Sequence, residues 1–154
     1  MAATKVLVPY NFSVHEWKAF DFVISILRGR DDVTITLFNT YVPVPEIDLT
    51  GNPELQKMRG GLIFLSEELK RKEQGLNSAV KYFLQHGFSE HQVDFLFKKK
   101  EKDVADEIID AVVKGRYDMV VLRPTPGKVS RLFARSVHER VLRSLQDVAV
   151  CIAT

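Results

Sequence analysis

The sequence has little cysteine: Cys151 is the single one among 154 residues. One cysteine cannot form an internal disulfide, which excludes a disulfide-stabilised secreted domain and favours a reducing compartment. No apolar run approaches the roughly 20 residues that a membrane-spanning helix needs, so we expect no membrane insertion. The start, MAATKVLVPY, lacks the longer apolar core of a signal peptide. These absences predict a cytoplasmic protein.

An excess of charge of one sign is also absent. The chain has 22 Lys and Arg against 20 Asp and Glu, for a net charge of +2. This balance gives no indication of a nucleic-acid partner. With 45% apolar and 27% charged residues, the composition is that of an ordinary globular chain. The length suits one domain, 1–154, with a substantial core, because domains are commonly about 100–150 residues long.

Catalytic and metal-binding patterns are missing as well. The histidines do not pair with another His, Cys or acid at a metal-like spacing; they are His15, His86, His91 and His138. There is no G-x-S-x-G elbow and no G-x-x-x-x-G-K-[ST] loop. Cys151 lies in an apolar stretch and is interpreted as an inert core thiol. We therefore predict neither a metal site nor an enzyme.

What the sequence does have is a regular alternation of strand-like and helix-like segments. Five short runs rich in apolar residues alternate with segments of helical periodicity; the runs are 5–10, 33–42, 92–97, 118–122 and 148–153. This order predicts an α/β fold with a five-stranded, mostly parallel sheet and helices on both faces. Ligands of such sheets bind beyond the carboxyl ends of the strands.

The ends of the predicted helices carry typical signals. Gly29 is placed to end the first helix, and Gly115 to close the helix that starts after 98–100. Asn52 is placed to cap the next helix, and Pro53 to be its first residue. They open a long helix, 53–86, which His86–Gly87 ends. Its apolar stripe comprises Leu55, Met58, Leu62, Leu65 and Leu69, resumes at Val80, Phe83 and Leu84, and contains weak points at Gly60–Gly61 and Gly75.

Polar residues after the predicted strands are candidate ligand contacts. Asn11 follows the first strand and Thr40 the second, and each could bind a ligand or form a turn. Lys98, Lys99 and Lys100 suggest a phosphate partner or, more commonly, a solvated charge run. We interpret the acids at 103, 106, 107 and 110 as a polar helix face.

Three stretches show a resemblance to a known family. KVLVPYNFS resembles the opening strand and turn of the universal stress protein family, usually V-P-x-D-x-S. RYDMVVL and ARSVHERVLRSLQDVAVCIA resemble its fourth strand and its ending. The resemblance implies an adenine nucleotide α-hydrolase-like fold, similar to the Rossmann architecture. It also implies a homodimer in which strands 148–153 pair antiparallel, which would cover an exposed edge.

Members of this family that bind ATP share G-x2-G-x9-G-[ST] after the fourth strand. In this sequence only Ser136 remains, because Arg135 takes the place of the third glycine. The first two glycine positions fall on Leu122 and Thr125 in one alignment, and on Arg123 and Pro126 in the other. We therefore interpret 122–136 as a degenerate nucleotide-binding motif.

These replacements have direct physical consequences. Pro124 and Pro126 remove two amide donors and fix φ. Arg135 places a long side chain where a backbone should approach phosphate. Asn11 replaces the family's aspartate and lacks its charge. Thr40 matches the position that usually meets the adenine edge and is compatible with that role.

We predict a non-enzymatic stress-response or regulatory protein that binds no ATP and acts as a dimer on an unidentified protein partner. One alternative is a nucleotide or anion site built from basic side chains. Its candidates are Asn11, Thr40, Arg123, Thr125, Gly127, Lys128, Arg135 and Ser136, with Arg131, Arg140 and Arg143 as further cations. Another alternative is a stand-alone relative of regulatory domains that are attached to membrane transporters.

Overall fold

The computed structural model describes residues 3–11, 16–122, 137 and 139–153. Five strands form one sheet in the order β3-β2-β1-β4-β5, and every pairing between neighbours is parallel. The strands are β1 (Thr4–Pro9), β2 (Val33–Tyr41), β3 (Val93–Lys99), β4 (Met119–Leu122) and β5 (Ala149–Ile152). The predicted fold class is confirmed.

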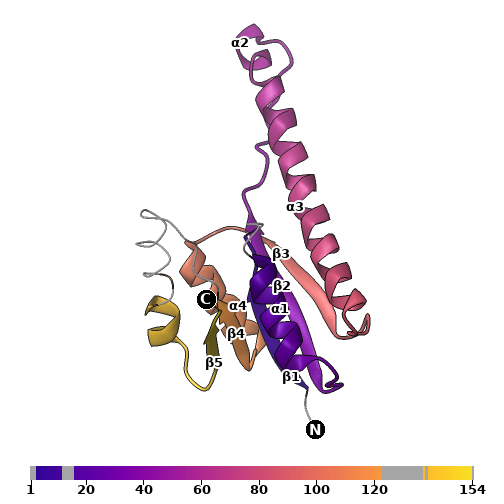
Figure 1. Cartoon of the computed structure of the whole chain (residues 1–154). Helices are drawn as coiled ribbons and strands as arrows, with labels where there is room; N and C mark the ends of the chain where they lie inside the picture. The colour runs from indigo at the N-terminus through magenta and orange to yellow at the C-terminus, as the bar shows by residue number, and fades with distance from the viewer. Residues whose placement is uncertain (1–2, 12–15, 123–136, 138, 154) are drawn as a thin grey trace.

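Four helices are bounded in the described part of the chain: α1 (Glu16–Leu27), α2 (Pro53–Gln56), α3 (Arg59–Gln85) and α4 (Val104–Gly115). Residues 137 and 139–144 are helical as well. Helices α1 and α3 contribute to one hydrophobic cluster, and α4 with Val141 to a second. Figure 1 shows these helices around the sheet. No helix within the described ranges is long and apolar enough to cross a membrane.

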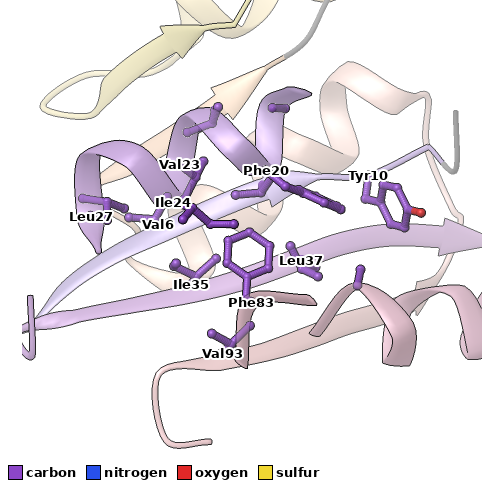
Figure 2. Packing of buried hydrophobic residues seen from close by; sticks show 14 of the residues in the cluster. Val6, Tyr10, Phe20, Val23, Ile24, Leu27, Ile35, Leu37, Phe83 and Val93 are labelled. Atoms are coloured by element: carbon purple, nitrogen blue, oxygen red, sulfur yellow. The ribbon is translucent and has the colours of Figure 1, made fainter. Parts of the chain in front are cut away.

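The two cores follow from the alternation of side chains along β1. Val6 and Val8 belong to the first cluster, Leu7 belongs to the second, and all three are fully buried. A strand covered on both faces needs such a continuous apolar run. In the first core, the rings of Phe20 and Phe83 lie 5.2 Å apart. Figure 2 shows Phe83 reaching from α3 into the space beside the strand residues.

Most of the predicted helix ends are confirmed. Asn52 caps α2 by accepting a hydrogen bond from the Glu54 amide, and Pro53 opens that helix. Gly29 and Gly87 take φ values of +86° and +101°, which suit glycine. At α4, however, the left-handed cap residue is Arg116. Gly115 is still helical, and a glycine fits there for another reason, since a Cβ would collide with the neighbouring Tyr117 ring.

The predicted long helix 53–86 is divided in two. The chain leaves the helix at Lys57 and Met58, so that α2 and α3 are separate. Gly60 and Gly61, which we predicted to be weak points, lie inside α3. The helix extends well beyond the sheet, and α2 lies at its far end (Figure 1).

Candidate functional site

The carboxyl ends of β1, β2 and β3 lie at one edge of the sheet, here called the carboxyl edge. Pro9 pairs with Phe38 in the β1–β2 ladder, and Thr40 pairs with Lys98 in the β2–β3 ladder. Asn11, which is exposed, follows two residues after Pro9. The structure thus brings the predicted residues Asn11 and Thr40 to the same edge.

The remaining candidates of the predicted loop site lie outside the described residues. They are Arg123, Thr125, Gly127, Lys128, Arg135 and Ser136. The same applies to Arg131, His15 and His138.

Asn39 in β2 binds the backbone that follows β1 at the carboxyl edge, a role that the sequence analysis missed. Its side-chain amide donates a hydrogen bond to the Tyr10 carbonyl. The Tyr10 amide in turn donates to the Phe38 carbonyl over 2.8 Å. The Tyr10 ring is buried and packs 5.1 Å from Phe20. The backbone after β1 is therefore held against β2. The signal available in the sequence was an Asn next to the candidate Thr40, inside a strand that disfavours Asn.

Glu107 is buried beneath the loop that follows β3, with 1% of its surface exposed. Its Oε1 accepts hydrogen bonds from the Lys102 and Glu101 amides, at 3.0 and 3.3 Å. Its Oε2 lies 3.0 Å from Nζ of Lys98. The interpretation of this acid as part of a polar helix face is wrong, because the carboxylate holds the β3–α4 loop and not solvent.

The surroundings of Glu107 keep it charged. Burial by itself acts to raise the pKa of the carboxyl group. The ion pair with Lys98 and the hydrogen bonds from the loop amides act in the opposite direction and prevail, so the pKa lies below its usual value. Glu107 and Lys98 therefore form a mostly buried ion pair at the carboxyl edge.

The three lysines after β3 are thus not equivalent. Lys99 and Lys100 are exposed, as a solvated charge run would be. Lys98 is partly buried against Glu107. The Lys100 amide donates to the Tyr41 carbonyl over 2.8 Å, which extends the β2–β3 connection.

Two more acids of this region bind Arg140. Its guanidinium lies 2.7 Å from Asp103 Oδ2 and 2.5 Å from Asp106 Oδ1. Asp103 also caps α4 by accepting a hydrogen bond from the Asp106 amide. This bond, followed by that from Arg140, lowers the pKa of Asp103. Arg140, which the anion-site alternative counted as an available cation, is already paired with two carboxylates.

A fourth acid follows the same rule. Asp110 lies 2.6 Å from Nζ of Lys102, and this contact lowers the pKa of the carboxyl group. All four acids that we had interpreted as a polar helix face therefore contact a basic side chain. Around the start of α4, Lys98, Lys102 and Arg140 are all neutralised within the chain.

The other candidates carry less chemistry. Within the part of the chain that the structure describes, no group of three His, Cys, Asp or Glu side chains could hold a metal ion. Cys151 is half-buried against the first core. A hollow of about 410 Å³ lies away from the carboxyl edge and is lined by Leu49, Thr50, Gln56 and Arg59. It contains no pair of acids and no nucleophile with a base.

Strand β5 is the last strand on its side of the sheet. The amides of Ala149 and Ala153 donate to carbonyls of Asp118 and Leu122, at 2.9 and 2.8 Å. Because amides alternate in direction along a strand, those of residues 150 and 152 point away from β4. The predicted pairing of strands 148–153 between two copies stays a prediction.

Comparison with known proteins places this geometry among solved folds. The universal stress protein UspA from Lactobacillus plantarum superimposes with a TM-score of 0.68 at 16% identity, covering 100% of this chain and 99% of that one. A universal stress protein from Archaeoglobus fulgidus in complex with dAMP gives 0.66 at 15% identity and full coverage of both chains. A universal stress protein in complex with cAMP gives 0.59 at 15% identity, covering 100% and 98%. No curated protein matches the sequence.

The sequence itself carries the family assignment. The model of the universal stress protein family matches residues 3–151, nearly the full length. The superposition covers nearly the full length of this chain and of the solved relatives, which shows a common fold. This chain belongs to the universal stress protein family.

Proposed function

We propose that this chain is a non-enzymatic regulatory member of the universal stress protein family that does not bind ATP. The observation that carries the proposal is the internal neutralisation of cations at the carboxyl edge. Acids of the α4 region bind Lys98, at the end of β3, and Arg140, which follows the loop 122–136, whereas Lys99 and Lys100 remain exposed to solvent. A triphosphate would have to compete with these carboxylates.

The energetics of the ion pairs support this proposal. Removing Lys98 from Glu107 would leave a buried carboxylate without its counter-charge, which costs several kcal/mol in typical proteins. A loop of glycines would offer main-chain amides without such a cost. The sequence of 122–136 has one glycine and two prolines instead. A phosphate would therefore find few of the usual backbone donors in this loop. It would also find Lys98 and Arg140 already bound to acids.

The solved relatives indicate which ligands to test. Two of them were solved as complexes with dAMP and cAMP, so adenine nucleotides are the appropriate probes. We expect titration calorimetry with ATP, dAMP and cAMP to show no binding at micromolar concentration, and native mass spectrometry of the purified protein to show the bare chain. The dAMP-binding relative from Archaeoglobus fulgidus serves as the positive control.

One result would favour the anion-site alternative. If ATP bound at micromolar concentration and Arg123→Ala or Arg135→Ala abolished that binding, basic side chains would have replaced the glycines and the proposal would be wrong. The conservative variants Arg123→Lys and Arg135→Lys would then separate charge from guanidinium geometry.

We further propose that the chain forms a homodimer through β5. The outward amides at 150 and 152 and the position of β5 at the sheet edge support this pairing. The variant Ile152→Pro removes one outward amide and leaves the donors to β4 in place. We expect it to weaken a dimer that light scattering detects for the wild type, whereas Ile152→Thr keeps the amide and the dimer. A monomeric wild type at micromolar concentration would contradict the pairing.

A further inference from the structure

The helix α3 has two halves with opposite environments. Its buried residues Leu76, Ala79 and Phe83 all lie in the second half, against the sheet. Residues 59–75, here called the distal half, contain the run Leu62-Ile63-Phe64-Leu65. Ile63, Phe64 and Leu65 have 51%, 57% and 47% of their surface exposed. Figure 1 shows this part of α3 extending away from the sheet.

Four consecutive apolar residues make the helix apolar around its whole circumference at this point. Such a segment is normally buried, since no side of it is suited to water. The loop and α2 leave Ile63 and Phe64 exposed. The distal half therefore has the composition of a covered helix without a cover from the described chain.

The polar residues on the outward side indicate what covers it. At about 100° per residue, Phe64, Glu67 and Arg71 lie along one line, within about 60° of one another around the helix, and each is at least about 100° away from Leu76 and Phe83. Gly60, Gln74 and Ser78 continue this line with alternating steps of four and three residues. This spacing is that of the contact line between two paired helices.

The charges on this line complement those of a second copy that runs in the opposite direction. A second copy running antiparallel about a two-fold axis at Leu69 would place its Arg71 opposite Glu67, and its Glu67 opposite Arg71. Glu67 has no hydrogen bond or ion pair among the described residues, whereas Arg71 contacts the exposed Glu68. A guanidinium has five N–H donors and can serve two carboxylates. A parallel arrangement would instead place Glu67 against Glu67.

We propose that a second copy of this chain packs antiparallel along the distal half of α3. In this arrangement Phe64 of each copy lies against Gln74 of the other and is covered by it. Gly60 lies opposite Ser78, which allows close approach of the two helices, and the Glu67–Arg71 pairs set the direction. This contact uses a different surface from β5 and does not depend on whether a nucleotide binds. A chain that forms both contacts assembles beyond a dimer.

Analytical ultracentrifugation of the full chain over a range of concentrations tests the proposal. We expect the wild-type mass to rise with concentration, and the Phe64→Glu variant to reach about half that mass at the same concentration. Phe64 is exposed in the single chain, so the variant should keep its fold, which circular dichroism can check. Val113→Glu, on the exposed side of α4, is the matched control and should associate like the wild type.

Charge reversal tests the antiparallel direction. Glu67→Arg and Arg71→Glu each place like charges opposite one another, and each should weaken self-association by about tenfold. Mixed in equal amounts, the two variants restore both opposite-charge pairs and should associate like the wild type. Pairing through β5 alone would be insensitive to this mixing.

Three results would overturn the proposal. The first is an equal mass for the wild type and Phe64→Glu at every concentration. The second is a mixture of Glu67→Arg and Arg71→Glu that associates no better than either variant. The third is a wild type whose mass never rises while it sediments with phosphatidylcholine–phosphatidylglycerol vesicles, which would assign the apolar run to a lipid surface.

Discussion

The carboxyl edge of the sheet and the distal half of α3 differ in how many of their side chains find partners within the chain. At the edge, Glu107 and Lys98 neutralise one another, and Arg140 is held by two aspartates. On the distal half, Ile63 and Phe64 remain half-exposed in a stretch that is apolar on all sides.

The carboxyl edge is a surface that every fold of this class has, whereas the distal half is the surface for which we propose a partner. In α/β proteins the carboxyl edge is the usual ligand site, yet here Lys98 and Arg140 are already paired with acids of the same chain. The distal half lies outside the sheet altogether, and its apolar side chains have no internal use. Changes at the edge should therefore affect folding, whereas changes on the distal half should affect association.

The largest effect at the carboxyl edge is expected for Glu107→Ala. This change removes the acceptor of the Glu101 and Lys102 amides and leaves Lys98 without its counter-charge. We expect the free energy of unfolding to fall by about 3 kcal/mol, at the lower end for a buried pair because Lys98 is partly exposed. Urea denaturation measures the change. A loss below about 0.5 kcal/mol would show that the ion pair does not hold the edge.

Acid should weaken the carboxyl edge in the same way. The folded-state pKa of Glu107 is lower than the usual 4.5, so its stabilising contribution is complete above about pH 4.5 and is lost as the pH falls through the folded-state pKa. We expect the stability of the wild type to decrease over this acid range. Glu107→Gln, measured in parallel, should show a shallower decrease, and identical slopes would contradict the assignment.

A smaller effect of opposite sign is expected for Gly61→Ala on the distal half. Gly61 is helical, and a Cβ there would meet no other atom within 4 Å. Alanine should therefore stabilise the start of α3 by about 0.5 kcal/mol. Slower hydrogen exchange of the distal amides, without change in the sheet, is the expected measurement. Faster exchange would show that this segment is not helical in solution.

The smallest effect on folding is expected for Phe64→Ser. The side chain is 57% exposed in the single chain, so the free energy of unfolding at a concentration that keeps the protein dissociated should change by less than about 0.5 kcal/mol. Phe83→Ala, on the buried half of the same helix, should cost about 4 kcal/mol by comparison. Equal losses for the two would remove the distinction between the halves of α3.

The fold could be predicted because its signals are local and repeated. Val6, Leu7 and Val8 form an uninterrupted apolar run, and alternation with helical segments left few topologies open. The caps at Asn52 and Gly29 were also evident, since each rests on a conformational preference of one residue. The break at Lys57–Met58 had no such signal, because both residues are good helix formers.

The candidate site was predicted only in part. Asn11 and Thr40 were found because they follow predicted strands. Glu107 was misinterpreted because an acid among other acids on a helix is usually solvated, and only the approach of Lys98 from β3 makes its burial favourable. Asn39 was overlooked because its partner, the Tyr10 carbonyl, is 29 residues away and carries no sequence signal.

By itself the sequence determined the family, the α/β class, the order of the elements and the presence of a single glycine in 122–136, since all of these depend on residue identity and spacing along the chain. The tertiary structure decided which charges meet and which apolar residues stay exposed. Lys98 reaches Glu107 because β3 ends beside the start of α4, and Phe64 remains exposed because α3 extends beyond the end of the sheet. Such outcomes depend on distances between elements, which periodicity along one segment does not encode.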